Sequence, residues 1–148
     1  MTPDIRTYLH IRTAGPSGFN RDGRKLLVSS NLPGTFQVHR LDLDAPREGP
    51  VAAEHLVQVT GHDEPVGAGY LPDRDHLLLV TDAGGDERHQ LFLGPDDPPR
   101  PLRFDDLEPL VIDREHIHRP GGVTRDGTHL AYATNRRDGV AFDVVVRH

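Results

Sequence analysis

One pattern occurs three times in this chain, at a spacing of about fifty residues. Each copy has a glycine, an aspartate four residues later, and then a short apolar run. The aspartates are Asp22, Asp73 and Asp126, which lie 51 and 53 residues apart. A repeat of this length with strand-like content is typical of the blades of a β-propeller, because one such sheet cannot bury its faces alone. The predicted fold is all-β: a partial β-propeller of about three blades of antiparallel strands.

The repeated aspartates predict tight turns between the first two strands of each blade. An aspartate carboxylate can accept backbone hydrogen bonds that close such a turn, and a glycine tolerates the positive φ that the turn requires. The residues expected to have this structural role are Asp22, Gly23, Asp73, Asp126 and Gly127.

Glycines and apolar runs predict the rest of each blade. Glycines four residues before the aspartates are expected where an inner strand passes close to a neighbouring blade; they are Gly18, Gly69 and Gly122. A third strand is expected at 36–43, 88–94 and 140–146, and a fourth at 54–60 and around 109–113. The predicted units are 14–60, 65–113 and 117–148, after an N-terminal strand within 1–13. In the third unit the sequence stops before a fourth strand could form.

Composition excludes several classes of function. The net charge is −6, and the 23 acidic and 17 basic residues are interspersed, so nucleic acid is not an expected partner. The chain has no cysteine, which removes disulfides, thiolate metal sites and thiol nucleophiles. The sequence shows no apolar run of signal-peptide or membrane-span length, so we expect a cytoplasmic protein without a membrane partner. No cofactor is expected.

The turns also carry a resemblance to a known family. Turns of the form (F/Y)-x-x-D-G before a short apolar strand resemble the propeller repeats of prolyl oligopeptidase-family serine peptidases and of TolB-like propellers. The segments 8–30, 82–93 and 134–146 are similar to the first half of the peptidase propeller, in the acylaminoacyl-peptidase and dipeptidyl-aminopeptidase branch. In that family the propeller caps an α/β-hydrolase domain that carries the catalytic Ser, Asp and His, and it restricts entry to small peptides.

The resemblance implies a non-catalytic role for this chain. It would gate and select peptide substrates for a hydrolase domain that the sequence does not contain. A nucleophile elbow requires G-x-S-x-G, and the nearest approach to it is Ser17 in GPSGF, which lacks the second glycine at the right position. We therefore expect no catalytic residue. The alternative is a stand-alone TolB-like module that binds a protein partner.

Glu87 is the first candidate site residue. Peptidases of the family place a propeller glutamate in a G-x-E-x-x-x-L context that faces the catalytic cavity, and Gly85, Glu87 and Leu91 match it here. The resemblance implies that Glu87 pairs with an arginine of the hydrolase domain or helps to orient a substrate, because a carboxylate at a cavity mouth attracts cations. The alternative is a solvated turn residue.

Arginines and histidines supply two further hypotheses. Arg136 and Arg137 could bind an anionic group or a substrate carboxylate, or form a salt-bridged turn with Asp138. His116 and His118 would share a face of a strand and could reach one ion, with Asp113 and Glu115 nearby. We expect no metal, because no third ligand stands at a fixed spacing from the histidines.

An open propeller also predicts self-association. Exposed strand edges and apolar blade faces invite contacts with other molecules. One route is for residues 8–12 (YLHIR) of one copy to supply the missing outer strand of the last blade in another copy.

Overall fold

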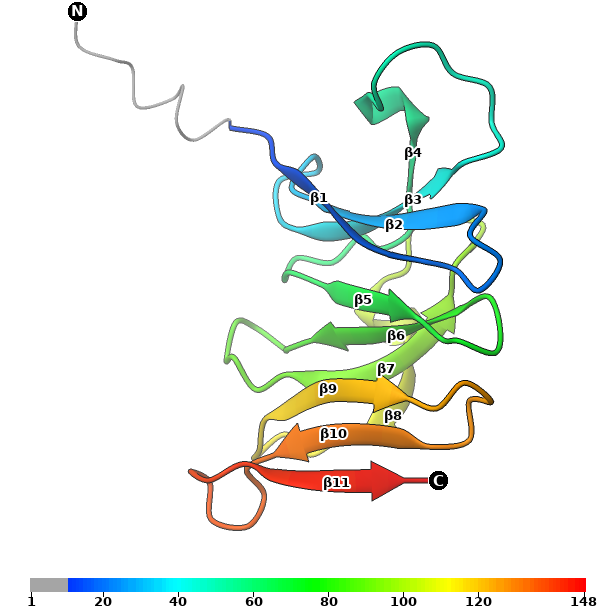
Figure 1. The fold of residues 1–148 in the computed structure, drawn as a ribbon. Helices are drawn as coiled ribbons and strands as arrows, with labels where there is room; N and C mark the ends of the chain where they lie inside the picture. The colour runs from blue at the N-terminus through cyan, green and yellow to red at the C-terminus, as the bar shows by residue number, and fades with distance from the viewer. Residues whose placement is uncertain (1–10) are drawn as a thin grey trace, which may run out of the picture.

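The computed structural model describes residues 11–148, which form three antiparallel sheets (Figure 1). The strands of each sheet pair in their order along the chain, as in a propeller blade. Blade 1 contains β1 (Ala14–Phe19), β2 (Lys25–Ser30), β3 (Gln37–Asp42) and β4 (Leu56–Gln58). Blade 2 contains β5 (Gly67–Tyr70), β6 (His76–Thr81), β7 (Gln90–Pro95) and β8 (Glu108–Val111). Blade 3 contains β9 (His118–Val123), β10 (Leu130–Thr134) and β11 (Asp143–Arg147).

The predicted all-β partial propeller with about three blades is therefore confirmed. The only helical segments in the described residues are two single 3-10 turns, η1 (Ala53–His55) and η2 (Phe104–Asp106). None of the helical turns within 11–148 has the length and apolarity needed to cross a bilayer. The expected fourth strands appear as β4 and β8. The expected N-terminal strand falls largely on residues 1–10, outside the described residues, and residues 11–13 are not part of a strand.

The first and third turns close as the repeat predicts. Gly23 and Gly127 both have φ of 72°, the left-handed conformation that favours glycine. Asp22 Oδ1 accepts a hydrogen bond from the N–H of Arg24 at 3.0 Å, and Asp126 Oδ1 accepts one from the N–H of Thr128 at 3.1 Å. The hydrogen bonds to Asp126, first those from Thr124 and Thr128, lower the pKa of its carboxyl to about 2.

Asp73 lies in the middle turn but contacts the neighbouring blades instead of its own backbone. Its carbonyl accepts a hydrogen bond from Arg21 Nη1 of blade 1 at 3.0 Å. Its carboxylate lies against Gly127 of blade 3, and the buried Oδ1 has no hydrogen-bond partner. The turn is closed by a backbone hydrogen bond from the N–H of Leu71 to the carbonyl of His76. The aspartate of blade 2 thus belongs to the contacts between blades.

The repeated glycines are not the residues that need a close approach. A Cβ added at Gly18, Gly69 or Gly122 would meet no atom within 4 Å, so the expected collision with a neighbouring blade is wrong. The close approach occurs one residue earlier in blade 3. Gly121 lies at a shift of register between β9 and β10, and a Cβ there would be 2.9 Å from the carbonyl oxygen of Ala131. A β-bulge, rather than the repeated glycine itself, requires the small residue.

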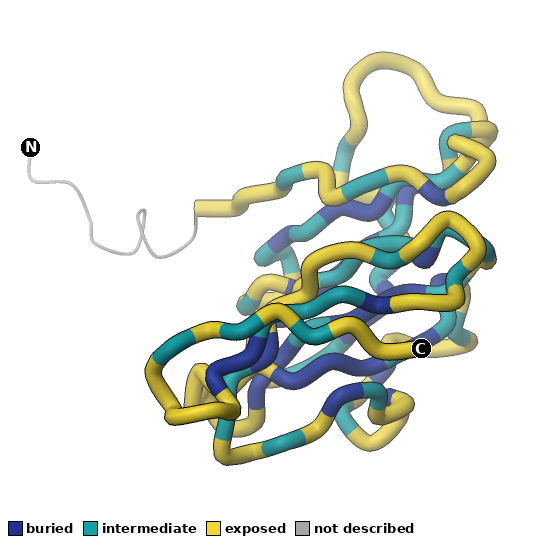
Figure 2. The backbone as a smooth tube through the Cα atoms, turned by 60° about the horizontal axis from the view of Figure 1, so that its bottom comes forward, coloured by how far each residue is buried: buried dark blue, intermediate teal, exposed yellow. Residues whose placement is uncertain are grey.

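The hydrophobic core lies between the blades, in two layers. On β6, Leu77 and Leu79 pack toward blade 1, and Leu78 and Val80 pack toward blade 3. Because both faces of β6 are buried, its run 77–80 is continuously apolar and does not alternate between apolar and polar residues. Figure 2 shows the buried residues along the central strands and the exposed residues in the loops.

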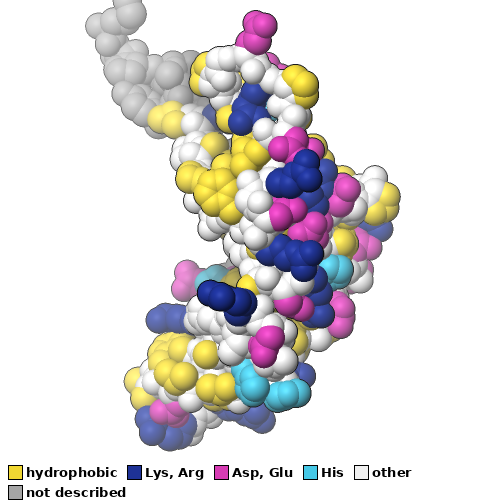
Figure 3. All heavy atoms as spheres, turned by 45° about the vertical axis from the view of Figure 1, so that its right-hand side comes forward, with side chains coloured by type: hydrophobic (Ala, Val, Ile, Leu, Met, Phe, Trp, Pro, Cys, Tyr) yellow, Lys and Arg dark blue, Asp and Glu magenta, His cyan; other side chains and the backbone are white. Residues whose placement is uncertain are grey.

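Ion pairs join blade 1 to blade 2 at the turn end of the sheets. Figure 3 shows basic and acidic side chains alternating along this side of the molecule. Lys25 Nζ lies 3.2 Å from Asp75 Oδ2 and 2.8 Å from Asp96 Oδ2, and Arg40 Nη1 lies 2.8 Å from Asp97 Oδ1. Burial opposes ionisation of Asp75, but hydrogen bonds from Lys25 and Asn20 outweigh it and lower the pKa of this carboxyl.

Candidate functional site

The candidate site residues share the end of the sheets opposite the aspartate turns. The loops from β2 to β3, β6 to β7 and β10 to β11 leave the blades at this end, as do the connections between blades (Figure 1). We call this end the loop face. It carries Glu87 in the β6–β7 loop and both Arg136 and Arg137 in the β10–β11 loop.

Glu87 has a strained backbone. Its φ of 60° makes it the only non-glycine residue of 11–148 in the left-handed region. Such a conformation costs on the order of 1 kcal/mol for a residue with a Cβ. The N–H of Glu87 donates to Asp82 Oδ2 at 2.6 Å, which holds the loop in this shape. The carboxylate of Glu87 is exposed on the loop face.

An acidic cleft lies beside this loop. It has a volume of about 420 Å³ and opens between the β4–β5 connection, the start of the β6–β7 loop and the segment 103–105. Its lining contains four carboxylates, which belong to Asp63, Glu64, Asp82 and Asp105, and one arginine, Arg103. Carboxylates gathered in a concave surface attract cations and raise their local concentration. Asp82 links the cleft to Glu87, because it lines the cleft and its carboxylate accepts a hydrogen bond from the backbone N–H of Glu87.

Two glutamines at equivalent positions hold the connections between blades. Each is buried and is the first residue of the third strand of its blade: Gln37 in β3 and Gln90 in β7. Gln37 Nε2 donates to the carbonyls of His62 and Glu64, at 3.1 and 2.9 Å. Gln90 Nε2 donates to the carbonyls of Asp113 and His116, at 3.1 and 3.0 Å. The repeat of the aspartate turns did not predict this role; the glutamines lie 53 residues apart, close to the 51 residues between Asp22 and Asp73 in the same two blades.

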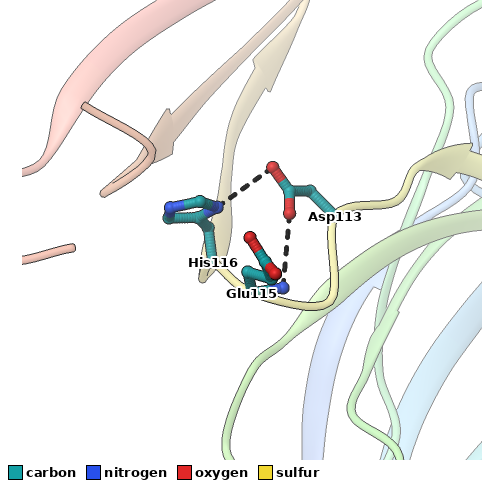
Figure 4. Close-up of side chains that lie close together, drawn as sticks. All are labelled: Asp113, Glu115 and His116. Carbon is teal, nitrogen blue, oxygen red and sulfur yellow. Dashed lines mark hydrogen bonds and ion pairs between the residues drawn. The ribbon is translucent and has the colours of Figure 1, made fainter. Parts of the chain in front are cut away.

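Asp113 and His116 form a hydrogen-bonded pair in the connection between blades 2 and 3 (Figure 4). Asp113 Oδ2 lies 3.0 Å from His116 Nδ1 and 3.4 Å from Nε of Arg136. The hydrogen bond with His116 and the charge of Arg136 lower the pKa of Asp113. Arg136 therefore crosses from the β10–β11 loop to the inter-blade connection.

Arg137 has a different environment from its neighbour. Its Nε lies 3.7 Å from Asp138 Oδ2, and its Nη1 lies 3.4 Å from Asp143 Oδ1. This is the salt-bridged turn that the sequence left as the alternative. The two arginines do not converge on one anion.

The metal hypothesis named four residues, and the structure brings three of them together. Asp113, Glu115 and His116 place one ligand atom each within 4.8 Å of one another. His118 is buried at the start of β9, whereas His116 lies in the preceding turn, so the two histidines do not share a strand face. The Asp113 carboxylate already pairs with His116 and with the guanidinium of Arg136.

Ser17 lies within β1, at a shift of register between β1 and β2. It is an exposed strand residue and does not occupy the strand-to-helix turn that a nucleophile elbow requires.

His118 predicts a dependence of stability on pH. It is 2% exposed, neither ring nitrogen has a hydrogen-bond partner, and burial lowers its pKa. In the unfolded chain the histidine binds a proton below about pH 6.5, whereas in the folded chain its lowered pKa disfavours protonation. The free energy of unfolding therefore decreases as the pH falls below that value. We expect the free energy of unfolding in urea to be smaller at about pH 5.5 than at about pH 7.5.

The variant His118→Phe tests the origin of this change. It keeps the edge-to-face contact with Tyr132 and removes the group that titrates. The loss of stability between the two pH values should become smaller, whereas His129→Gln at an exposed position should leave it unchanged. An unchanged pH dependence in His118→Phe would contradict the assignment.

Comparison of the sequence with known family models and with curated proteins gives no match. The relationship to prolyl oligopeptidase-family propellers therefore stays a prediction.

Proposed function

We propose that this chain is the non-catalytic propeller part of a peptidase-like assembly, in which its loop face selects peptides by their cationic groups. The hydrolase domain of such an assembly would supply the catalytic residues. The observation that carries the proposal is the strained backbone of Glu87, held by a hydrogen bond to Asp82, which itself lines an acidic cleft. Backbone strain at one exposed residue is typical of a functional site, where it fixes the direction of a side chain.

The charge of the cleft suggests which end of a peptide it receives. Burial lowers the pKa of His62, so this cleft residue adds no positive charge at neutral pH. The four carboxylates then outweigh Arg103, and a peptide α-amino group is the small cation that every unmodified peptide carries. Glu87 and the cleft together would orient the amino end of a peptide.

The proposal predicts that binding depends on a free amino terminus. The probes are trialanine with a free amino end and the same peptide with an acetylated amino end, titrated into the labelled chain and followed by NMR. We expect saturable shifts in residues 82–89 with the free peptide and at least fivefold weaker binding of the acetylated one, since acetylation removes the charge.

Glu87→Gln should weaken the binding of free trialanine to the level of the acetylated peptide. Glu48→Gln, an exposed carboxylate in the β3–β4 loop, is the matched control and should bind normally. Glu87→Gly serves as a second variant because glycine suits the left-handed backbone; it should keep the fold and lose the binding. Equal binding of the two peptides would contradict selection by the amino group, and would favour the TolB-like module that binds a protein partner.

A further inference from the structure

Blade 3 has an apolar face that no other blade covers within the described residues 11–148. Ala131 of blade 3 is equivalent to Leu78 of blade 2. Each pairs with the repeated glycine of its own blade, Leu78 with Gly69 and Ala131 with Gly122. Leu78 packs toward the following blade. The corresponding surface of blade 3 consists of Ala131 and Ala133 on β10 and their β11 partners Val146 and Val144. We call these four residues the trailing face; Val144 and Val146 are 77% and 64% exposed.

Blade 1 has the complementary surface. Its outer side forms a groove of about 360 Å³, which is lined in part by Leu26, Val28, Val51 and Leu56. Each of these residues lies 51 positions before a residue of the core between blades 1 and 2, namely Leu77, Leu79, Leu102 and Leu107. We call the four groove residues the leading face. The groove residues of blade 1 thus occupy the repeat positions through which blade 2 packs against blade 1. A groove built from these positions fits the trailing face of a preceding blade.

The polar contacts between blades extend to these two surfaces. Arg21 of blade 1 donates to the carbonyl of Asp73 in the next blade. Arg125 stands at the position of Arg21 in the third repeat, and Asp22 stands at the position of Asp73 in the first repeat. A blade 3 seated on a blade 1 would place Arg125 beside the carbonyl of Asp22. Apolar and polar repeat positions therefore specify the same partner surface.

We propose that the trailing face of one copy binds the leading face of a second copy. Stacked blades bury a continuous core, and propellers typically close with four to eight blades. Two copies bring six blades and can use both faces of each copy in one closed ring, whereas three copies would exceed the usual range. The partner is thus a second copy of this chain, joined head to tail at two interfaces. This route uses blade faces, not the exchange of residues 8–12.

Sedimentation velocity and light scattering of the 148-residue chain test the proposal. We expect a species of twice the 16.4 kDa chain mass at micromolar concentrations. Val144→Glu on the trailing face and Val51→Glu on the leading face should each give monomers, because a charge would be buried at both interfaces of the ring. Val57→Glu, on the exposed outer strand β4, is the control and should remain dimeric.

Mixing the two monomeric variants distinguishes head-to-tail contact from contact between identical faces. One copy retains an intact trailing face and the other an intact leading face, so the mixture should form a heterodimer through a single interface. Circular dichroism of each variant verifies the fold, and Val144→Lys replaces Val144→Glu if that variant is unfolded. A monomeric wild type, a dimeric Val144→Glu, or a mixture that stays monomeric would each overturn the proposal.

Discussion

Gly127→Ala should destabilise the chain far more than the equivalent change Gly23→Ala. Both glycines have φ of 72°, so each alanine variant incurs about 1–2 kcal/mol of backbone strain. At Gly23 the added Cβ would meet no atom within 4 Å. At Gly127 it would lie 2.5 Å from Asp73 Cγ, which adds roughly 1–3 kcal/mol for overpacking at a contact between blades. Urea unfolding of the two variants at neutral pH measures the difference.

Asp73→Ala provides the decisive background for this comparison. It removes the carboxylate that the new methyl group would meet, so the effect of Gly127→Ala should decrease to that of Gly23→Ala. The effect of Gly23→Ala should not change in the same background. Equal effects of Gly127→Ala with and without Asp73 would show that the carboxylate moves away without a penalty.

The elements of this fold could be predicted because their signals are local. Asp22 and Gly23 lie within one turn, and their hydrogen bonds and positive φ follow from residue chemistry at that turn. The strands follow from apolar runs between such turns. The repeat then indicates how many sheets these elements form.

Contacts between blades could not be predicted in the same way. Asp73 belongs to the same repeat position as Asp22, but its carboxylate faces Gly127 of the next blade. The repeat alone does not show which of the equivalent aspartates contacts a neighbouring blade. The two aspartates differ only in the residues that surround them in three dimensions. Gln37 and Gln90 illustrate the same limit, since a glutamine that begins a strand usually lies at the surface.

The candidate site was predicted in part. The context of Glu87 was visible in the sequence, but its strained φ and its hydrogen bond to Asp82 depend on the shape of the β6–β7 loop. The acidic cleft combines residues from three separate segments. Arg136 and Arg137 are adjacent in sequence, yet they pair with different carboxylates because successive side chains of a turn point in different directions.

Leu79→Ala should produce the second large loss of stability. Leu79 is fully buried in β6, at the centre of the core shared by blades 1 and 2. Truncation of a buried leucine typically costs about 2–5 kcal/mol, from lost burial and from the cavity that remains. Val57→Ala, which truncates a half-exposed side chain on β4, should change the free energy of unfolding by less than about 1 kcal/mol.

Gly94 makes the prediction specific to this packing contact. A Cβ added at Gly94 would lie 2.9 Å from Leu79 Cδ1 and 3.1 Å from Leu102 Cδ1, so Gly94→Ala alone should cost about 1–3 kcal/mol. When Gly94→Ala is combined with Leu79→Ala, the new methyl group at position 94 would enter the space that the leucine side chain leaves. The double variant should then be less destabilised than the sum of the single variants, by at least about 1 kcal/mol in urea unfolding. Additive effects would mean that the blade relaxes around each change separately, and that the two side chains do not compete for one space.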